Sequence, residues 1–218
     1  MTQPDLFGPS TGPAGGPLLI PLAEAEPLKL WRGWLRDSPG WLEALTHSIP
    51  WEDHILGTPG GKVPAPRREC WFANSAGVPY TYSGETYLSR SIAEVQGLHG
   101  LREDVERATG ETFDALFTNL YRSGKDSIGW HADAEVNALG PLPEIVIASL
   151  SLGARRIFAV RHRRNTAEEV RVELGEGDLL LMGRGVQSHY LHQAPKTARA
   201  VGPRLNLTFR RLVGRGSR

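Results

Sequence analysis

The feature of this sequence that most restricts its fold is a series of short strand-like runs that begins at Thr112. Turns containing Gly, Pro or charged residues separate the runs, which cover residues 112–121, 144–151, 155–161, 169–174, 178–182 and 204–212. The turn Gly175–Asp178 comes directly before an apolar run, Leu179–Met182. This rhythm is typical of antiparallel sandwiches and jelly rolls. We therefore predict a mainly β protein with flanking helices (α+β), built on a double-stranded β-helix, or jelly-roll, core over residues 112–218.

Two amphipathic helices are predicted ahead of the strand-like runs. Between Asp37 and Pro50, a capping Ser38, a Pro39 at the first helical position and apolar residues at helical spacing describe a short helix. A second helix is expected over residues 98–109, with Gly110 as its C-terminal cap. Residues 1–16 are rich in Pro and Gly and have no apolar periodicity, so they predict a disordered leader. The rest, residues 17–218, is expected to form one compact domain.

Composition narrows the classes of protein and of metal site. With 218 residues and 40% hydrophobic content, the chain is long enough to bury the core of one domain. It contains no run of about 18 apolar residues, which a membrane-spanning helix would need. The single cysteine, Cys70, excludes an internal disulfide and an all-thiolate metal site. We expect a soluble, cytoplasmic protein whose metal site, if any, uses histidine and carboxylate ligands.

Charge is distributed unevenly along a chain whose formal net charge is +1. Residues 151–218 hold 14 Arg and Lys against 5 Asp and Glu, a net charge of +9, which leaves −8 on the remainder. Such asymmetry suggests a polyanionic partner that meets one face, because neutralised phosphates supply most of the non-specific affinity for nucleic acid. A solvated arginine-rich surface is an equally good explanation of the charge pattern alone.

A candidate metal site begins with His131 and Asp133. One residue separates them, so on an extended segment both side chains point to the same side of the sheet. A third ligand would come from a distant strand, and the downstream candidates are His162, His189 and His192. Two histidines and one carboxylate are the expected ligand set for non-haem iron(II), which leaves coordination positions open.

Polar side chains on two strand-like segments are candidates for binding a small acid. The segment 204–210 alternates strictly: three apolar side chains share one face, and Arg204, Asn206, Thr208 and Arg210 share the other. Such a row suits a dicarboxylate, because guanidinium groups bind carboxylates with matching geometry. Asn119 and Tyr121 likewise share a face just ahead of the metal pair. The alternative is an ordinary amphipathic strand with a solvated arginine face.

The motifs, taken in order, resemble the AlkB family of nucleic-acid dealkylases over residues 64–212. They are N-L-Y-R-S-G-K-D-S-I-G-W-H-A-D-A-E (119–135), A-S-L-S-L-G-A-R-R-I-F (148–158), H-Q-A-P-K (192–196) and P-R-L-N-L-T-F-R (203–210). The last is similar to the family's co-substrate strand almost letter for letter. The resemblance implies an iron(II)- and 2-oxoglutarate-dependent dioxygenase that also consumes O2.

The resemblance also implies a role for each candidate residue. His192 would be the third iron ligand beside His131 and Asp133, with His189 as a neighbour. Arg204, helped by Tyr121, would bind the distal carboxylate of 2-oxoglutarate. The residues around the metal-proximal end of the co-substrate would be Asn119, Asn206 and Arg210.

Within the family, P-R-R-E-C-W-F (66–72) and P-Y-T-Y-S (79–83) are most similar to the eukaryotic nuclear DNA dealkylases. Residues 17–111 would then supply the N-terminal helices and a nucleotide-recognition lid, and a flipped base would lie between Tyr82 and His131. The implied substrate residues are Trp71, Tyr80, Tyr82 and Glu135. The implied reaction is demethylation of 1-methyladenine and 3-methylcytosine in DNA as alkylation-damage repair. The chain departs from the family in a longer 73–78 loop and in Ala134, where some relatives are acidic.

Other functions and partners remain open at this point. The same chemistry could act on RNA or another substrate, and a jelly roll without catalytic activity could still bind nucleic acid. In the leader, Gln3 to Phe7 resembles the short peptides that bind the bacterial sliding clamp. We expect a monomer with no membrane partner.

Overall fold

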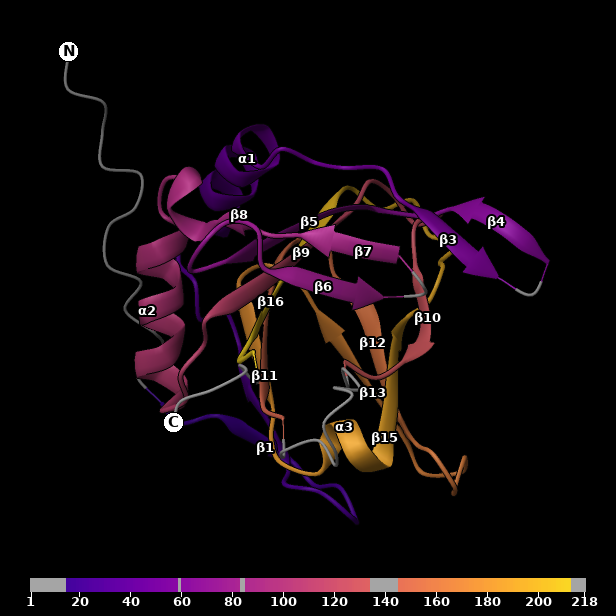
Figure 1. Ribbon diagram of the computed structural model, residues 1–218. Coiled ribbons are helices and arrows are strands. Elements are labelled where there is room, and N and C mark those ends of the chain that lie inside the picture. The colour runs from indigo at the N-terminus through magenta and orange to yellow at the C-terminus, as the bar shows by residue number, and fades with distance from the viewer. Residues whose placement is uncertain (1–14, 59, 83–84, 134–144, 213–218) are drawn as a thin grey trace, which may run out of the picture.

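Two β-sheets face each other and enclose the interior of the molecule (Figure 1). The computed structural model describes residues 15–58, 60–82, 85–133 and 145–212. The larger sheet has eight strands, in spatial order β1 (Leu18–Ile20), β2 (Leu28–Trp31), β14 (Asp178–Met182), β11 (Ile147–Gly153), β16 (Arg204–Arg210), β9 (Ala115–Tyr121), β5 (Arg68–Ala73) and β8 (Arg90–Ser91). Neighbouring strands are antiparallel except β5 and β8.

The smaller sheet has four antiparallel strands, in the order β10 (Ile128–His131), β15 (Tyr190–Ala194), β12 (Arg156–His162) and β13 (Glu169–Leu174). Two further hairpins join β3 (Ile55–Thr58) to β4 (Gly61–Pro64) and β6 (Pro79–Tyr82) to β7 (Glu85–Leu88). The β3–β4 hairpin projects from the body of the molecule in Figure 1. The helical elements are α1 (Ser38–Ser48), the 3-10 helix η1 (Ile92–Glu94), α2 (Leu98–Thr109) and α3 (Val186–His189).

This arrangement confirms the predicted mainly β, jelly-roll fold. Each of the six predicted runs overlaps one observed strand: β9, β11, β12, β13, β14 and β16. Sequence reasoning did not predict β10 and β15 as strands, although they carry His131 and His192. It also did not predict that the N-terminal segment supplies four strands, β1, β2, β5 and β8, to the larger sheet. The strands β1, β2, β8 and β10 have only two to four residues, too few to display a period. The strands β5 and β15 are longer, but their apolar and polar residues do not alternate.

The larger sheet buries its outer face against the helices. Leu205, Leu207 and Phe209 of β16 lie in one hydrophobic cluster with Leu45 of α1 and Leu101 of α2. The alternation predicted for this strand is confirmed, since its other face carries the polar side chains. All seven residues of β16 are nevertheless buried, so the polar face is not solvated. A polar row inside a protein requires partners, and these lie between the two sheets.

The space between the sheets is apolar at one end and polar at the other. A second hydrophobic cluster joins Ile147, Leu180 and Met182 of the larger sheet to Phe158 and Val160 of the smaller one. This cluster holds the two sheets together, and the remaining interior is left to the polar residues of β9 and β16.

Both predicted helices are present. The second was predicted correctly to the residue: α2 spans Leu98–Thr109, and Gly110 caps it in a left-handed conformation. For α1 the predicted cap was wrong: the side chain of Asp37, not Ser38, accepts the hydrogen bond from the Gly40 backbone N–H, and Pro39 lies within the first turn. An aspartate is as good a cap as a serine, so adjacent candidates compete. In the described part of the chain, no helix has the length and apolar character needed to cross a membrane.

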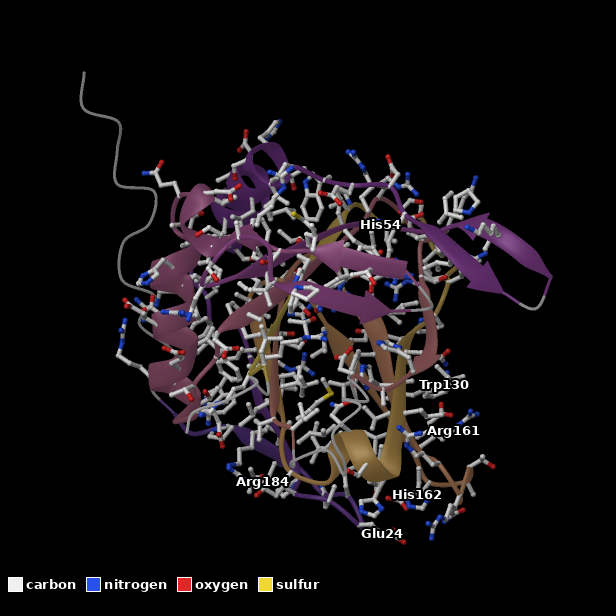
Figure 2. The ribbon with its side chains drawn as sticks, in the orientation of Figure 1. Glu24, His54, Trp130, Arg161, His162 and Arg184 are labelled. Carbon is white, nitrogen blue, oxygen red and sulfur yellow. The ribbon has the colours of Figure 1, made fainter. Side chains whose placement is uncertain are left out.

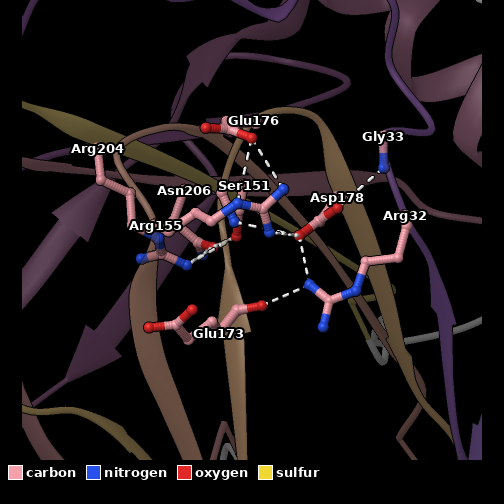
Figure 3. Close-up of polar contacts among 10 residues, drawn as sticks. Arg32, Gly33, Ser151, Arg155, Glu173, Glu176, Asp178, Arg204 and Asn206 are labelled. Carbon is pink, nitrogen blue, oxygen red and sulfur yellow. Dashed lines mark hydrogen bonds and ion pairs between the residues drawn. The ribbon is translucent and has the colours of Figure 1, made fainter.

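The predicted turn at Gly175–Asp178 is held by a buried carboxylate. Asp178 is fully buried, pairs with Arg32 (2.7 Å) and Arg155 (3.3 Å), and accepts the backbone N–H of Gly33 (Figure 3). Asp178 therefore joins the residues just after β2 to the start of β14. This network lies beside the polar interior of the sheet, as Figure 3 shows for Ser151.

Candidate metal and co-substrate site

One cavity between the two sheets collects the predicted metal and co-substrate residues. All eight of them line it: His131, Asp133, His192, Asn119, Tyr121, Arg204, Asn206 and Arg210. They come from β9, β10, β15, β16 and the residues just after β10, which are far apart in sequence. The structure thus brings together groups that the sequence could only name separately.

The three predicted metal ligands form one compact cluster. Their ligand atoms all lie within 4.8 Å of one another. Asp133 is central: its Oδ1 is 3.8 Å from Nε2 of His131, and its Oδ2 is 3.5 Å from Nε2 of His192. Metal–ligand bonds of about 2 Å place neighbouring donor atoms about 3 Å apart, so a small contraction would close the site. The donor set fits iron(II), which accepts imidazole and carboxylate together.

The protein prepares these ligands for a metal. Nδ1 of His131 lies 2.8 Å from the Gly129 carbonyl oxygen. A carbonyl can only accept, so Nδ1 carries the proton and the lone pair of Nε2 faces Asp133. Burial and the neighbouring His192 lower the pKa of His131 to about 3, which keeps the imidazole neutral. The Asp133 backbone N–H donates to Gln187 Oε1 at 2.9 Å, which fixes the backbone of Asp133 just after β10.

Asp133 is held ionised by its surroundings. Burial by itself would raise its pKa, but Arg210 and the two histidines outweigh burial and hold that pKa well below the usual range for a carboxyl. Arg210 supplies the direct contact, with its guanidinium 3.3 Å from Asp133 Oδ1. This contact runs from the larger sheet to the metal cluster on the smaller sheet.

The polar face of β16 explains why the co-substrate residues lie in a row. Because alternate residues of a strand share a face, Arg204, Asn206, Thr208 and Arg210 all point inward. Tyr121 lies opposite Arg204, and Asn119 lies opposite Asn206. Six residues of extended strand separate the Cα atoms of Arg204 and Arg210 by about 20 Å. Arg210 is at the metal end, so Arg204 marks the far end of the row.

Arg204 is oriented for a ligand at that far end. It is 2% exposed, and its guanidinium donates to Ser151 Oγ (2.7 Å) and Asn206 Oδ1 (2.9 Å) (Figure 3). It also lies over the ring of Tyr121, 5.3 Å from the ring centre. Its Nε has no hydrogen-bond partner among the described residues. A buried cation with an unused donor fits a carboxylate ligand such as the distal end of 2-oxoglutarate.

The predicted substrate residues are placed less completely. Trp71 is buried behind the cavity wall, where it packs on Phe117 and its Nε1 donates to the Val78 carbonyl. Tyr80 and Tyr82 belong to strand β6, but their side chains lie outside the described part of the structure. Glu135 and Ala134 also lie outside the described residues, as does Gln3 to Phe7. The roles of these residues stay predictions.

Sequence reasoning missed several cavity residues. Arg67 lines it from just before β5 and Glu69 from β5 itself, and Phe117 and Ser149 line it from β9 and β11. The available signal was Glu69, the acidic residue directly before the apolar residues 70–73 of β5, because a charge is rarely buried in a strand without a partner or a ligand. A single charge in a short run was too weak a signal without the register of β5 against β9.

A second group of potential ligands lies at another edge of the molecule. Glu24, His162 and His189 also bring three ligand atoms within 4.8 Å, and Figure 2 shows Glu24 and His162 together. However, Nδ1 of His162 accepts the backbone N–H groups of Arg164 and Asn165. The proton of a neutral ring is therefore on Nε2, which faces Glu24 at 3.3 Å. With no free lone pair on that ring, we interpret this cluster as a structural hydrogen-bond network.

Comparisons with known proteins agree with the geometry of the first cluster. The sequence profile of the 2OG-Fe(II) oxygenase superfamily matches residues 32–210. Alpha-ketoglutarate-dependent dioxygenase alkB homolog 3 of Mus musculus is 35% identical over 184 residues, which cover 81% of this chain and 62% of that protein. DNA oxidative demethylase ALKBH2 of Mus musculus is 37% identical over 155 residues, covering 68% of this chain and 62% of the relative.

The solved structure of OsALKBH1 matches with a TM-score of 0.60 and 18% identity, covering 88% of this chain and all of that one. This likeness concerns the fold. The chain spans about three fifths of the length of the curated relatives that it matches.

Proposed function

Because the chain belongs to the 2OG-Fe(II) oxygenase superfamily and, within it, to the AlkB type, we propose that it removes methyl groups oxidatively from nucleic-acid bases. The proposed substrates are 1-methyladenine and 3-methylcytosine in DNA, and the proposed role is repair of alkylation damage. The supporting observation is one cavity with His131, Asp133 and His192 at one end and the buried Arg204 at the other. The ALKBH2 relatives carry the name DNA oxidative demethylase.

The residues of the cavity fit the family's cofactor and co-substrates. Iron(II) would be held by His131, Asp133 and His192, and the distal carboxylate of 2-oxoglutarate by Arg204 with Tyr121. Asn119, Asn206 and Arg210 would surround the metal-proximal end. When bound, iron(II) with 2-oxoglutarate and O2 supplies the oxidation of the N-methyl carbon, which leaves as formaldehyde while the co-substrate becomes succinate and carbon dioxide.

The chain's own residues would do the binding, the orientation and the exclusion of water. The Gly129 carbonyl keeps the lone pair of His131 Nε2 directed at the metal position. Arg210 balances the charge of Asp133. Phe117 and Phe158 give the cavity an apolar wall that keeps bulk water from the reacting carbon.

Recognition of the base belongs to this proposal as well. A flipped base would stack between Tyr82 and the ring of His131, with Tyr80 and Trp71 in the recognition segment. Glu135 would contact the exocyclic amine of the damaged base.

The test is a demethylation assay on a DNA oligonucleotide that carries one 3-methylcytosine. Loss of the methyl mass that requires both iron(II) and 2-oxoglutarate is the expected result. The variant His131→Ala is expected to have no measurable turnover, since a two-ligand site no longer holds the metal in place. Substantial turnover by this variant contradicts the ligand assignment. Consumption of 2-oxoglutarate without loss of the methyl group contradicts the substrate class.

RNA is the second candidate substrate, because the described residues that line the cavity fit the metal, the co-substrate and a base, which RNA and DNA share. The same assay with an RNA oligonucleotide of identical sequence decides between them. If neither oligonucleotide changes and 2-oxoglutarate is not consumed, a nucleic-acid-binding module without catalytic activity becomes the better account.

A sliding clamp is a proposed partner through Gln3 to Phe7. Deletion of residues 1–8 is expected to abolish binding to the clamp in a pull-down while demethylation of a short oligonucleotide continues. Clamp binding that survives the deletion refutes the motif. We also propose that the protein is a monomer and that it is located in the cytoplasm.

A further inference from the structure

A buried ion pair lies in the cavity wall next to the co-substrate residues. Arg67 and Glu69 both line the cavity, and their side chains are 2% and 1% exposed. The guanidinium of Arg67 is 2.5 Å from Glu69 Oε1. Neither residue belongs to the metal cluster or to the arginine row of β16.

The register of the sheet places Glu69 in the same inward-facing row as the co-substrate amides. Glu69 on β5 lies opposite Asn119 on β9, which lies opposite Asn206 on β16. Arg67 donates through Nε to Asn119 Oδ1 at 2.9 Å and reaches the Ser127 carbonyl at 3.4 Å. Ser127 directly precedes β10, the strand that ends in His131. The pair therefore lies on the wall that connects the co-substrate row with the metal strand.

Glu69 is not fully satisfied by the protein around it. Its Oε2 is buried and has no hydrogen-bond partner among the described residues. A buried pair of this kind is no more stabilising than well-packed apolar side chains, so stability alone does not explain the carboxylate. A buried acceptor that lines a cavity is instead a place for a ligand's donor.

The charges of the cavity indicate which kind of ligand donor would bind Glu69. Among the described lining residues, Arg67, Arg204 and Arg210 are cationic, and only Asp133 and Glu69 are anionic. The charges of iron(II) and of the 2-oxoglutarate dianion cancel, so the cavity has a net charge of +1 with Glu69 and +2 without it. A cationic base is easier to bury in the first case, because charge repulsion is strong in a buried site.

We propose that Glu69 is a specificity-determining residue that selects alkylated bases carrying a positive charge and an exocyclic amine. Its carboxylate accepts a hydrogen bond from one of the two N–H groups of the amine, which leaves the other for the contact proposed for Glu135, and its charge offsets that of the methylated ring. This inference rests on the proposed demethylase function and adds to it a residue that selects the class of base.

Two methylated bases of similar shape but different charge can serve as test substrates. 3-Methylcytosine is cationic at neutral pH and has an exocyclic amine, whereas 3-methylthymine is neutral and has a carbonyl at the same position. Both are N3-methylated pyrimidines, so they can be placed in otherwise identical oligonucleotides. The measured quantity is the ratio of kcat/KM for 3-methylcytosine to kcat/KM for 3-methylthymine, which compares the two transition states in one enzyme.

Glu69→Gln is expected to lower this ratio about tenfold, as expected for loss of a hydrogen bond between charged groups. Glu69→Asp keeps the charge but retracts it by one methylene, so its ratio should lie between those of the wild type and Glu69→Gln. The control is Glu52→Gln, which makes the same charge change. Glu52 is bridged to Glu69 through the backbone, but its side chain is 48% exposed and lies outside the cavity. The Glu52→Gln variant should have the same ratio of kcat/KM values as the wild type.

Equal losses of kcat/KM on both lesions in Glu69→Gln would overturn the inference, because a carboxylate that only neutralises Arg67 has no reason to distinguish them. A wild-type protein that demethylates neither lesion would contradict the proposed function, and this inference with it. An unchanged ratio beside a demethylating wild type contradicts the role of Glu69 alone.

Discussion

Arg204 is a buried cation with no carboxylate partner among the described residues. Arg204→Ala is expected to raise the KM for 2-oxoglutarate by about 10- to 100-fold, since a hydrogen-bonded charge pair in a buried site contributes about 1.5–3 kcal/mol. Titration of 2-oxoglutarate consumption measures this change. Arg199→Ala is the control, because Arg199 is exposed and pairs with Glu173. An unchanged KM in Arg204→Ala would assign the distal carboxylate to another residue.

Cys70 offers a single-site probe of the helix-side core. It is 1% exposed, and burial, reinforced by the charge of Glu52, raises the pKa of its thiol to about 12 from an ordinary value of 9.0. The thiolate, which is the reactive form, is therefore suppressed in the folded protein at pH 8.5. We therefore expect iodoacetamide to label Cys70 no faster than the protein unfolds. The rate of labelling is measured from the increase in the mass of the intact protein.

The linkage of this pKa to stability has a definite sign. Above pH 9 the unfolded chain loses the thiol proton more readily than the folded one, so the contribution of Cys70 to stability falls between pH 9 and 12. Cys70→Ser should abolish the labelling. Rapid labelling of the native wild type at pH 8.5 would show that the β5 strand opens without global unfolding.

At the scale of elements, the turn that ends β11 depends on one glycine. Gly153 has φ +75°, and a Cβ there would lie 2.5 Å from the Pro203 carbonyl oxygen, just before β16. Gly110 has almost the same φ, +74°, but nothing lies within 4 Å of a Cβ built on it. The two positions share the backbone strain and differ in the steric overlap.

Gly110→Ala is therefore expected to lower the free energy of unfolding by about 1 kcal/mol, and Gly153→Ala by about 3 kcal/mol or more. Urea unfolding of both variants measures the difference. Equal losses would mean that β16 can shift away from the β11 turn without cost.

At the scale of the whole molecule, the two halves of the site lie on different sheets. His131 and His192 belong to the smaller sheet, whereas Arg204, Asn206 and Tyr121 belong to the larger one. A ligand that binds the metal and Arg204 together would tie the sheets to each other. A ligand stabilises a fold by an amount that rises with the logarithm of its affinity for the native state. If the metal raises the affinity for 2-oxoglutarate, the two ligands together should stabilise the fold by more than the sum of their separate effects.

We expect nickel(II) and 2-oxoglutarate together to raise Tm by more than the sum of their separate effects, with nickel replacing iron to prevent turnover. Thermal denaturation in the four ligand conditions measures the synergy. Arg204→Ala should retain the shift from nickel alone and lose the synergy. Purely additive shifts in the wild type would place 2-oxoglutarate away from the metal.

The tertiary structure also shows which of the unevenly distributed charges are paired. Several basic residues of the C-terminal third are paired with acids: Arg155 with Glu176 and Asp178, Arg199 with Glu173, and Arg184 with Glu26 and Glu111. The last pairs join the C-terminal third to the acidic N-terminal part. Arg161 instead stacks over the ring of Trp130 at 4.2 Å, which Figure 2 shows beside β10. Pairs within the C-terminal third leave its net charge of +9 unchanged. Among the described residues, Arg184 and Arg210 are the arginines of that third that pair with acids of the rest of the chain, so most of the asymmetry stays available to a partner.

The sequence by itself determined the features that depend on local period and on residue type. Helix α2 and the two faces of β16 follow from apolar spacing, because a period is visible in a window of seven or more residues. The shorter strands β13 and β14 could be predicted because turn residues separate them. The pair His131 and Asp133 could be recognised because, with one residue between them, an extended segment directs both side chains to the same side, although β10 itself ends at His131.

Only the tertiary structure decided which distant groups meet. His162, His189 and His192 are equivalent in a sequence, but the pairing of β10 with β15 places His192 beside His131 and leaves the other two at another edge. The register of β5 against β9 places Glu69 in the cavity wall, opposite Asn119. Arg184 pairs with Glu111, which is distant in the sequence. Sheet register and long-range pairing depend on the free energy of the whole packed chain, which no local window contains.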